Sequence, residues 1–437
     1  MKKIVKFITL GCKVNQYETN AMAQKFLEKG YEVIEAENEK ETEVKPDICI
    51  INTCTVTNMS DRKSRQMLRR MKEKNPDTIV VAVGCYAQVA KEELLKIPEI
   101  DLSLGNNEKV EIVKYVEEYI KENINQIDIE DVMKSREFSE FGNITYTEKT
   151  RAVIKIQDGC DRFCSYCIIP YARGRVRSRK PESIISEITE IADKGIKEVV
   201  ITGIHIASYG KDFKEDYKLI DLLEEINKIE GIKRIRLGSI EPLLITEEFV
   251  ERLKRLKKIC HHFHLSLQSG CDETLKRMNR RYTTKQFRNI VNILRNTYED
   301  VNLTTDIIVG FPGETEEEFN KTYEFLKEIK FYKMHVFKYS PRKGTKASVM
   351  ENQIPGNIKE ERSKKLIELS NKNEFEYNNK YIGKEVEVLF EEEKTGIYKG
   401  HTQNYIMIYC ESKKKLDNKI QKVQCKKVNK DHIIAEL

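Results

Sequence analysis

The sequence lacks any segment that would place it in a membrane or direct it out of the cell. No uninterrupted apolar run approaches the ~18 residues that a membrane-spanning helix needs. Residues 1–6 lead into no apolar stretch of the length that a secretory signal peptide requires. We therefore expect a cytoplasmic protein with no membrane partner, in a compartment that keeps its thiols reduced.

Tryptophan is also absent, and neither sign of charge dominates. Hydrophobic residues still make up 39% of the chain, which is enough for ordinary cores. The length of 437 residues favours roughly two to four domains. Charged residues reach 34%, and the net charge of +6 is modest for this length. This balance permits a polyanionic partner without requiring one, so the distribution of charge is more informative than its sum.

Eleven cysteines are present, and three of them stand close together in the centre of the chain. Cys160, Cys164 and Cys167 have the spacing C-x3-C-x2-C and follow an apolar run over residues 152–156. Such a cluster indicates a metal or iron–sulfur site, because thiolates bind soft metals. Structural zinc needs a fourth ligand, and the next cysteine or histidine is His205. Three thiolates suit a four-iron cluster with one iron left free, while three unpaired core thiols are the alternative.

Three other cysteines follow three expected strands in the first part of the chain. Residues 4–10, 47–52 and 78–83 have the pattern of buried strands separated by helices, which favours a parallel sheet. The cysteines that come just after these strands are Cys12, Cys54 and Cys85. Because the carboxyl ends of parallel strands share one edge, we expect these thiols to meet in a second three-cysteine site. The alternative is three unrelated loop cysteines.

Strand and helix signals alternate again through the central part of the chain. Strands are expected at residues 153–156, 198–202, 234–238, 264–267, 302–309 and 333–337. Helices are expected near 182–194, 218–229, 246–257, 272–295 and 315–329. Six strand–helix units indicate a partial or complete parallel barrel, whose active site lies at the carboxyl ends of the strands.

Small and polar residues stand at several of these strand ends, where a ligand could approach the backbone. They are Thr202, Gly203, Ser239, Gln268, Val309 and Gly310. Each of them alone also suits a tight turn between a strand and a helix. Their shared placement is what favours a binding site.

Arginines and histidines gather at two points of the central part. Four arginines alternate along a segment expected to be extended, so all of them could project to one side: Arg173, Arg175, Arg177 and Arg179. Their place beside the cysteine loop favours binding of a substrate or a carboxylate over a solvated surface. Three histidines could bind a metal, although packing at the start of a strand is the favoured role: His261, His262 and His264.

The periodicity changes after about residue 380. Short alternating strands are expected at residues 385–390, 397–400, 405–410, 419–426 and 432–437. Five short strands in so small a span predict a small all-β barrel of the oligonucleotide-binding kind. Aromatic and basic residues are mixed there as on nucleic-acid surfaces, although about half of these aromatics should be core: Tyr398, His401, Tyr405 and Tyr409, with Lys394 and Lys399.

The cysteine motifs resemble those of one protein family. C-x3-C-x2-C with Tyr166 before the last cysteine is the signature of radical S-adenosylmethionine (SAM) enzymes. The longer text G-C-D-x-F-C-S-Y-C-I-I-P-x-A-R-G is similar to the methylthiotransferase branch, as are T-L-G-C-K-V-N, N-T-C-T-V-T and G-C-Y-A-Q in the first part. The resemblance covers nearly the whole chain. It implies an auxiliary-cluster domain over residues 1–125, a radical SAM core over 146–375 and an RNA-binding TRAM domain over 376–437.

The expected fold class is therefore α/β, with a parallel-sheet domain, a (β/α)6-type partial barrel and a small OB-like barrel. The resemblance implies two 4Fe-4S clusters and SAM as cofactors. The catalytic cluster would be held by Cys160, Cys164 and Cys167, and the auxiliary cluster by Cys12, Cys54 and Cys85. The residues implied to contact SAM are Tyr166, Thr202, Gly203, Ser239, Gln268, Val309 and Gly310.

Within the family, the text around residues 13–14 and 55–57 is similar to a bacterial type that acts on tRNA. That type methylthiolates C2 of N6-threonylcarbamoyladenosine at position 37, using two SAM molecules. One SAM yields a 5′-deoxyadenosyl radical, and the other methylates sulfur on the auxiliary cluster. The implied partners are the tRNA anticodon stem-loop, a sulfur donor and a reducing electron donor such as flavodoxin or ferredoxin.

Three alternatives stay open at this point. Two are methylthiolation of isopentenyladenosine in tRNA and methylthiolation of an aspartate in a ribosomal protein. The third is an iron–sulfur electron carrier or redox sensor with an RNA-binding tail, which would not turn over SAM.

Overall fold

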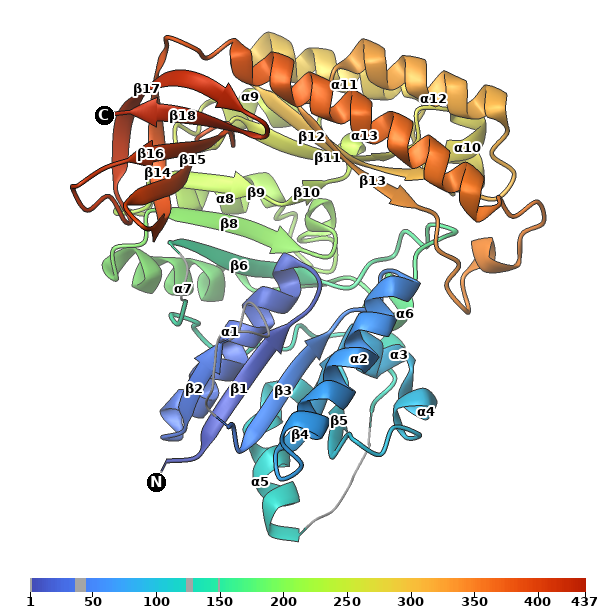
Figure 1. Cartoon of the computed structure of the whole chain (residues 1–437), viewed down its shortest axis with the longest axis vertical. Helices are drawn as coiled ribbons and strands as arrows, with labels where there is room; N and C mark the ends of the chain where they lie inside the picture. Colours follow the sequence, from blue (N-terminus) through green and yellow to red (C-terminus); the bar gives the residue numbers. More distant parts are fainter. Residues whose placement is uncertain (1, 36–44, 123–128, 148–149) are drawn as a thin grey trace.

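The computed structural model describes residues 2–35, 45–122, 129–147 and 150–437. An amino-terminal α/β part, a central strand–helix part and a carboxyl-terminal barrel follow one another along the chain (Figure 1). This mixed α/β architecture, with parallel sheets and a small closed barrel, confirms the fold class expected from the sequence. Among the described helices, none is both long and apolar enough to cross a membrane.

Five parallel strands form the sheet of the amino-terminal part, in the order β2-β1-β3-β4-β5. The strands are β1 (Ile4–Thr9), β2 (Glu32–Glu35), β3 (Ile48–Thr53), β4 (Ile79–Gly84) and β5 (Leu102–Leu104). The helices are α1 (Lys13–Glu28), α2 (Asn58–Lys74), α3 (Cys85–Val89), α4 (Lys91–Leu94) and α5 (Ile112–Glu122). Every residue of β3 is buried, because apolar clusters cover both faces of the sheet. The edge strand β2 is not predicted by the sequence pattern.

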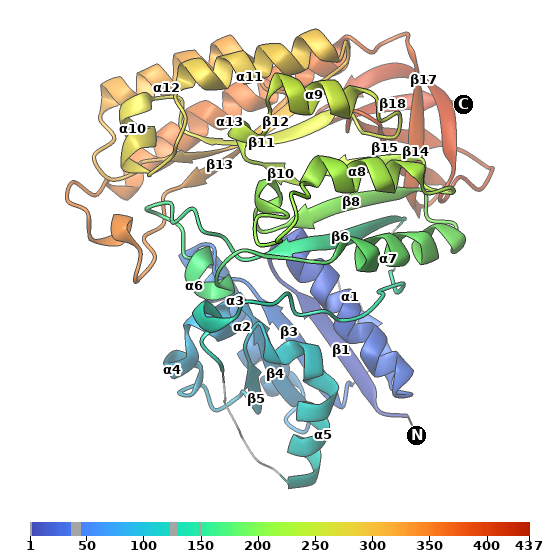
Figure 2. The same cartoon turned by 180° about the vertical axis from the view of Figure 1, so that it is seen from behind.

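The central part is an open barrel of parallel strands with helices outside (Figures 1 and 2). Its six main strands are β6 (Arg151–Asp158), β8 (Glu198–Gly203), β9 (Arg234–Leu237), β11 (His262–Gln268), β12 (Asn302–Val309) and β13 (Lys333–Lys338). Two short strands, β7 (Arg177–Ser178) and β10 (Ser239–Ile240), complete two four-stranded sheets, β7-β6-β8-β9 and β10-β11-β12-β13. The outer helices are α7 (Pro181–Asp193), α8 (Leu219–Lys228), α9 (Glu247–Lys254), α10 (Asp272–Arg277), α11 (Thr284–Thr297) and α12 (Glu316–Ile329).

Side chains alternate between the two faces of these strands, as the pleat requires. Ile154 and Ile201 belong to the large apolar cluster beneath the outer helices. The neighbouring positions Lys155 and Thr202 are also buried, and Lys155 pairs with Glu18 of α1 and with Asp158. The face of β6 opposite the outer helices therefore carries buried polar side chains.

One helix expected over residues 272–295 is two helices in the structure, so that expectation is wrong. Asn279 takes a left-handed backbone with φ of 58° just after α10 ends. Thr283 and Gln286 then form a capping box that starts α11. The segment between the two helices turns toward the cysteine loop, where Met278 O accepts the Ser165 N–H at 3.1 Å.

The carboxyl-terminal part follows the long helix α13 (Gly356–Asn379) and is a closed five-stranded barrel. Its strands are β14 (Glu385–Lys394), β15 (Ile397–Thr402), β16 (Met407–Glu411), β17 (Ile420–Asn429) and β18 (His432–Glu436). One of its pairs, β16 with β18, is parallel. The barrel docks where the central strands begin: Arg234 donates to His401 O at 2.9 Å and Arg236 to Gln403 O at 3.1 Å. Tyr398 and His401 are buried, so they belong to packing and not to an exposed aromatic surface.

Candidate functional site

The three amino-terminal cysteines meet at the carboxyl edge of the first sheet. Cys12 lies between β1 and α1, Cys54 directly follows β3, and Cys85 begins α3 after β4. Each thiol lies near enough to the others to affect their ionisation. A Cβ added to Gly11 would come within 3.0 Å of Cys54 Sγ. The topology thus gathers side chains that are far apart in the sequence.

A glycine with positive φ precedes three of the six cysteines at the two sites. Gly11, Gly84 and Gly159 have φ values of 106°, 94° and 70°, and they come directly before Cys12, Cys85 and Cys160. At Gly159 the close packing is most severe, because a Cβ would lie 1.8 Å from the carbonyl oxygen of Arg175. These glycines let the chain turn sharply at a strand end and point the next thiol into the site.

Replacing Gly159 by alanine is expected to displace the central cysteine loop. The left-handed backbone alone costs an L-residue about 1–2 kcal/mol, and the contact with Arg175 adds to it. Iron bound per chain after anaerobic reconstitution should fall, and unfolding in urea should begin earlier. Gly195→Ala is the matched control, because Gly195 also has positive φ but no atom within 4 Å of the added Cβ. Equal iron loading in the two variants would contradict this role of Gly159.

The central cysteines lie in the loop between β6 and α6 (Ile169–Arg173). Cys160 N–H donates to Gly174 O at 3.0 Å, and Cys167 N–H donates to Cys164 O at 3.0 Å, so the loop is closed at both ends. The Arg162 N–H points at Cys160 Sγ at 3.5 Å. All three cysteines are partly buried residues.

Arg280 is a site residue that the sequence did not single out. It lies between α10 and α11 and directs its guanidinium at Cys164 Sγ, at 3.4 Å. The same group donates to Glu241 at 2.8 Å and to the carbonyl oxygen of Ser266 at 2.9 Å, so its position is fixed. The sequence did carry one signal that could have placed Arg280 in a loop. The capping box at Thr283 marks the start of a helix, so the residues just before it lie outside that helix.

The positions predicted to contact SAM lie in the cysteine loop and after strands of the barrel. Tyr166 packs edge-on against Phe311, with ring centroids 6.5 Å apart. Gln268 ends β11 with φ of 72°, a strained conformation for a residue with a side chain. Gly310 also has positive φ, and its N–H donates to Glu314 at 2.8 Å.

Thr202 and Gly203 end β8 next to Gln157 of β6, and Val309 ends β12. Ser239 begins the short strand β10 and is exposed. Gly203 pairs with Gln157, just before the cysteine loop, and Tyr166 stands within that loop. Contact of these residues with SAM remains a prediction.

A buried network of charges separates the two groups of cysteines. Arg173 is fully buried and donates to Cys85 Sγ at 3.1 Å, to Asn15 at 2.7 Å and to Glu18. Burial would raise the pKa of Glu18, but Arg173 and two lysines hold it well below its ordinary value. Four cationic side chains face two carboxylates in this network: Lys109, Lys155, Arg173 and Arg177 with Glu18 and Asp158. Burial raises the pKa of Cys12, and the nearby positive charge of Arg173 opposes that rise.

The four arginines do not share one face, so the expectation from their spacing is wrong. Arg173 ends α6, whereas Arg175 is exposed and pairs with Asp161 at 3.2 Å. Arg177 and Arg179 are buried, and Arg179 pairs with Glu187 at 2.7 Å. Arg173 ends a helix and Gly174 has positive φ, so the extended backbone expected over 173–179 is interrupted at its start, although Arg177–Ser178 form the strand β7.

Each group of three thiols suits a cluster of several irons better than a single metal ion. A tetrahedral zinc with Zn–S bonds of about 2.3 Å would bring its sulfurs to about 3.8 Å from one another. Over the described ranges, only His264, Asp306 and His335 place three metal-ligand atoms within 4.8 Å of one another. Burial raises the pKa of Cys54 and of Cys160 to about 11, so iron binding must displace their protons.

Two of the three clustered histidines pack against aromatic rings, and the third faces a carboxylate. His261 packs on Tyr298 and His262 stacks on Tyr405, as expected for packing at a strand start. His264 instead faces Asp306, with 3.1 Å between Nε2 and Oδ2.

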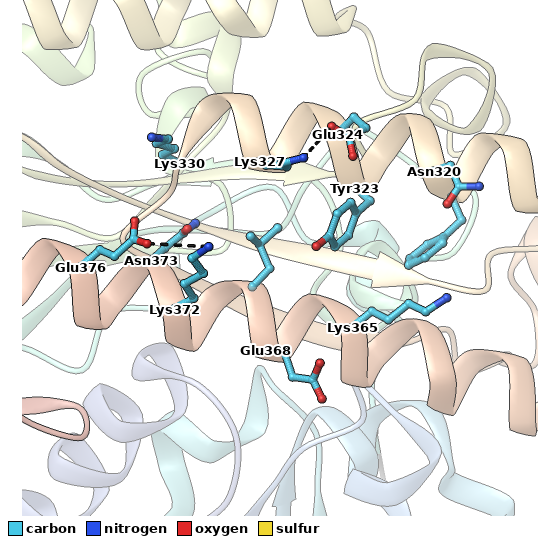
Figure 3. Close-up of a pocket in the computed structure, with 12 residues that line it drawn as sticks. Asn320, Tyr323, Glu324, Lys327, Lys330, Lys365, Glu368, Lys372, Asn373 and Glu376 are labelled. Carbon is cyan, nitrogen blue, oxygen red and sulfur yellow. Dashed lines mark hydrogen bonds and ion pairs between the residues drawn. The ribbon is translucent and has the colours of Figure 1, made fainter.

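A hollow of about 710 Å³ lies between α12 and α13, on the helix side of the barrel (Figure 3). Charged side chains of both signs line it, and several pair along their own helices: Lys327 with Glu324 at 3.3 Å and Lys372 with Glu376 at 3.9 Å. This pattern is typical of a solvated helix surface. The hollow shares no residue with either group of cysteines.

Comparison with known proteins agrees with this geometry. Residues 154–326 match the Radical SAM superfamily, and residues 4–105 match the family described as uncharacterized protein family UPF0004. The Threonylcarbamoyladenosine tRNA methylthiotransferase MtaB of Bacillus subtilis is 44% identical over 96% of this chain and 93% of its own. The protein of the same name from Aquifex aeolicus is 43% identical over 94% and 98%.

A tRNA-2-methylthio-N(6)-dimethylallyladenosine synthase from Moorella thermoacetica is 37% identical over 89% of this chain and 87% of its own. Among solved structures, the radical SAM methyltransferase TsrM from Kitasatospora setae has a TM-score of 0.59 at 16% identity, over 80% of this chain and 77% of its own. That likeness shows the fold alone.

The barrel and its loop of three cysteines define a radical SAM enzyme. The chain belongs to the radical SAM methylthiotransferase family.

Proposed function

We propose that the protein methylthiolates C2 of N6-threonylcarbamoyladenosine at position 37 of tRNA, with SAM and two 4Fe-4S clusters as cofactors. The observation that carries the proposal is the presence of two groups of three cysteines, separated by the buried Arg173 network. The names of the relatives that are 43–44% identical support this nucleoside as the substrate.

The two cysteine groups have separate roles in this proposal. Cys160, Cys164 and Cys167 would hold the cluster that binds SAM, and Cys12, Cys54 and Cys85 would hold the auxiliary cluster. With SAM bound, the first cluster supplies the 5′-deoxyadenosyl radical that an unactivated adenine C–H bond requires. The protein excludes water from the region between the sites by packing Arg173, Glu18 and Lys155 there.

The strand ends of the barrel would position SAM. Thr202 and Gly203 offer backbone at the end of β8, beside the cysteine loop. Gln268, Val309 and Gly310 offer backbone at the ends of β11 and β12, while Tyr166 stands in the loop itself. Small residues and left-handed turns let a ligand approach these backbone groups closely.

The tRNA would be held mainly through its phosphates. Exposed cations occur on α2, which begins four residues after Cys54: Arg62, Lys63 and Arg69. Three more lysines are exposed between β16 and β17, on the barrel that we propose to be a TRAM domain: Lys413, Lys414 and Lys415. Clusters of exposed cations are typical of nucleic-acid surfaces.

The deciding experiment is mass spectrometry of tRNA nucleosides from a strain that lacks the gene. We expect the 2-methylthio derivative of threonylcarbamoyladenosine to disappear and the unmethylthiolated nucleoside to accumulate. Loss of methylthiolated isopentenyladenosine would support the other tRNA substrate, and unchanged tRNA would support a protein substrate. An electron carrier would form no 5′-deoxyadenosine from SAM after anaerobic reconstitution and reduction.

A further inference from the structure

A cavity of about 730 Å³ lies where the three parts of the chain meet. Cys12 and Lys13 line it from the start of α1, Arg151 and Val153 from β6, and Tyr405 from the carboxyl-terminal barrel. Figure 1 shows α1 beside β6, with the barrel formed by β14–β18 at the start of the central strands. Cys12, a ligand of the proposed auxiliary cluster, thus forms part of the cavity wall.

Lys13 extends into this cavity without a partner of its own. Within the part of the chain that the structure describes, its ammonium makes no hydrogen bond and no ion pair. The charged and titratable groups that act on it electrostatically include Arg151, Arg236, Glu198 and the phenol of Tyr405, and Lys13 in turn acts on His262 and His335. Lys13 is exposed to solvent at the cavity, so its unpaired ammonium is accessible to an anionic ligand that enters there.

The carboxylates around the cavity are already occupied. Glu198 binds Arg236 at 2.7 Å, and Glu391 binds Arg151 at 2.9 Å. His401 contacts Glu391 as well, at 2.8 Å, and Glu392 binds Lys399 at 3.3 Å. These pairs neutralise the acidic side chains. Among the described residues that line the cavity, Lys13 is therefore the cation that has no acidic partner.

The start of α1 adds to the attraction for an anion. Cys12 is the N-cap residue of this 16-residue helix, and its side chain makes no capping hydrogen bond. The first turn contains no acidic side chain. The free N–H groups and the positive end of the helix dipole therefore point toward the same region as Lys13.

We propose that Lys13 binds the carboxylate of the threonylcarbamoyl group of the substrate nucleoside. The proposal rests on the proposed function, and it names the residue that selects this nucleoside. Cys12 and Lys13 line the same cavity, so a ligand of Lys13 would lie beside the proposed auxiliary cluster. The threonyl carboxylate is attached to the nucleobase itself, whereas the RNA phosphates lie beyond the ribose. An isopentenyl group would leave the ammonium beside hydrocarbon, which disfavours that substrate.

The test compares two anticodon stem-loop RNAs on the reconstituted holoenzyme. One carries threonylcarbamoyladenosine, and the other carries its threoninamide analogue, which lacks only the negative charge. The wild type should prefer the carboxylate. Lys13→Met should lose about 10- to 100-fold in kcat/KM on the carboxylate RNA, the range for one hydrogen bond to a charged group, and should change little on the amide. The binding affinity for the two RNAs, measured by fluorescence anisotropy, should show the same loss of preference.

Two further variants complete the test. Lys13→Arg should keep the preference for the carboxylate, because it keeps the cation. Lys29→Met removes an exposed lysine at the far end of α1 and should behave as the wild type. An unchanged preference in Lys13→Met overturns the proposal, and so does an equal loss on both RNAs, which would indicate a damaged cluster. If the wild type modifies neither RNA, the proposed function itself fails and this proposal with it.

Discussion

Replacing Cys164 by alanine is expected to abolish both SAM cleavage and methylthiolation, whereas Cys54→Ala should abolish only methylthiolation. The reason is the separation of the two thiol groups. Cys164 lies in the loop after β6 with Arg280 against its sulfur at 3.4 Å, and Cys54 lies across the Arg173 network at the edge of the first sheet. Loss of one thiol leaves two ligands at that site and three at the other.

Two products measured in one reaction decide this prediction. 5′-Deoxyadenosine reports SAM cleavage, and the methylthiolated nucleoside reports the complete reaction; both should fall to background in Cys164→Ala. Cys49→Ala is the matched control, because Cys49 is buried within β3 in the same domain as Cys54 and belongs to neither thiol group. The division of roles would be refuted if Cys54→Ala and Cys164→Ala, both folded, lost SAM cleavage equally.

Replacing Arg173 by methionine is expected to lower the free energy of unfolding by about 3–5 kcal/mol, the cost of breaking a buried charge pair. Arg173 is fully buried, and its guanidinium donates hydrogen bonds to Glu18 and Asn15. A further N–H of the same group donates to Cys85 Sγ at 3.1 Å. Methionine fills similar space but leaves Glu18 without its bidentate partner. Urea denaturation of the wild type and the variant measures the loss.

A second readout separates this role from simple packing. Hydrogen bonds to cluster sulfurs and nearby positive charge both raise a cluster's reduction potential. We therefore expect the potential of the auxiliary cluster to fall in Arg173→Met and to fall less in Arg173→Lys. Arg175→Met is the control: Arg175 is exposed and pairs with Asp161 at 3.2 Å, so it should cost under about 1 kcal/mol. A variant Arg173→Met as stable as Arg175→Met would exclude the proposed network.

The strands and the places of the cysteines could be predicted because their signals are local. β6, β8, β11, β12 and β13 coincide with apolar or alternating runs. A thiol that follows such a run is placed at a strand end by the chain itself, and the parallel arrangement then brings strand ends to one edge. The helix break before Thr283 had a local signal in its capping box, but the apolar spacing on either side concealed it.

Roles that depend on contacts between distant segments could not be predicted in this way. The spacing of Arg173 and Arg175 suggested equal roles, yet one is fully buried against Cys85 and the other is exposed. Arg280 is 116 positions from Cys164 in the sequence, and only the turn between α10 and α11 brings it there. Lys13 looked like part of a motif and proved to be a cation in a cavity built from three parts of the chain.

The sequence by itself determined the class of fold and the two groups of three cysteines, because strand periodicity and turns at strand ends are written within a few residues of each thiol. The tertiary structure decided which charges are buried, which sulfurs have an N–H donor and where, within the described ranges, an unpaired ammonium lies. The physical reason is that burial and ion pairing depend on what packs against a side chain. For Arg173, Arg280 and Lys13, the packing partners come from distant parts of the chain.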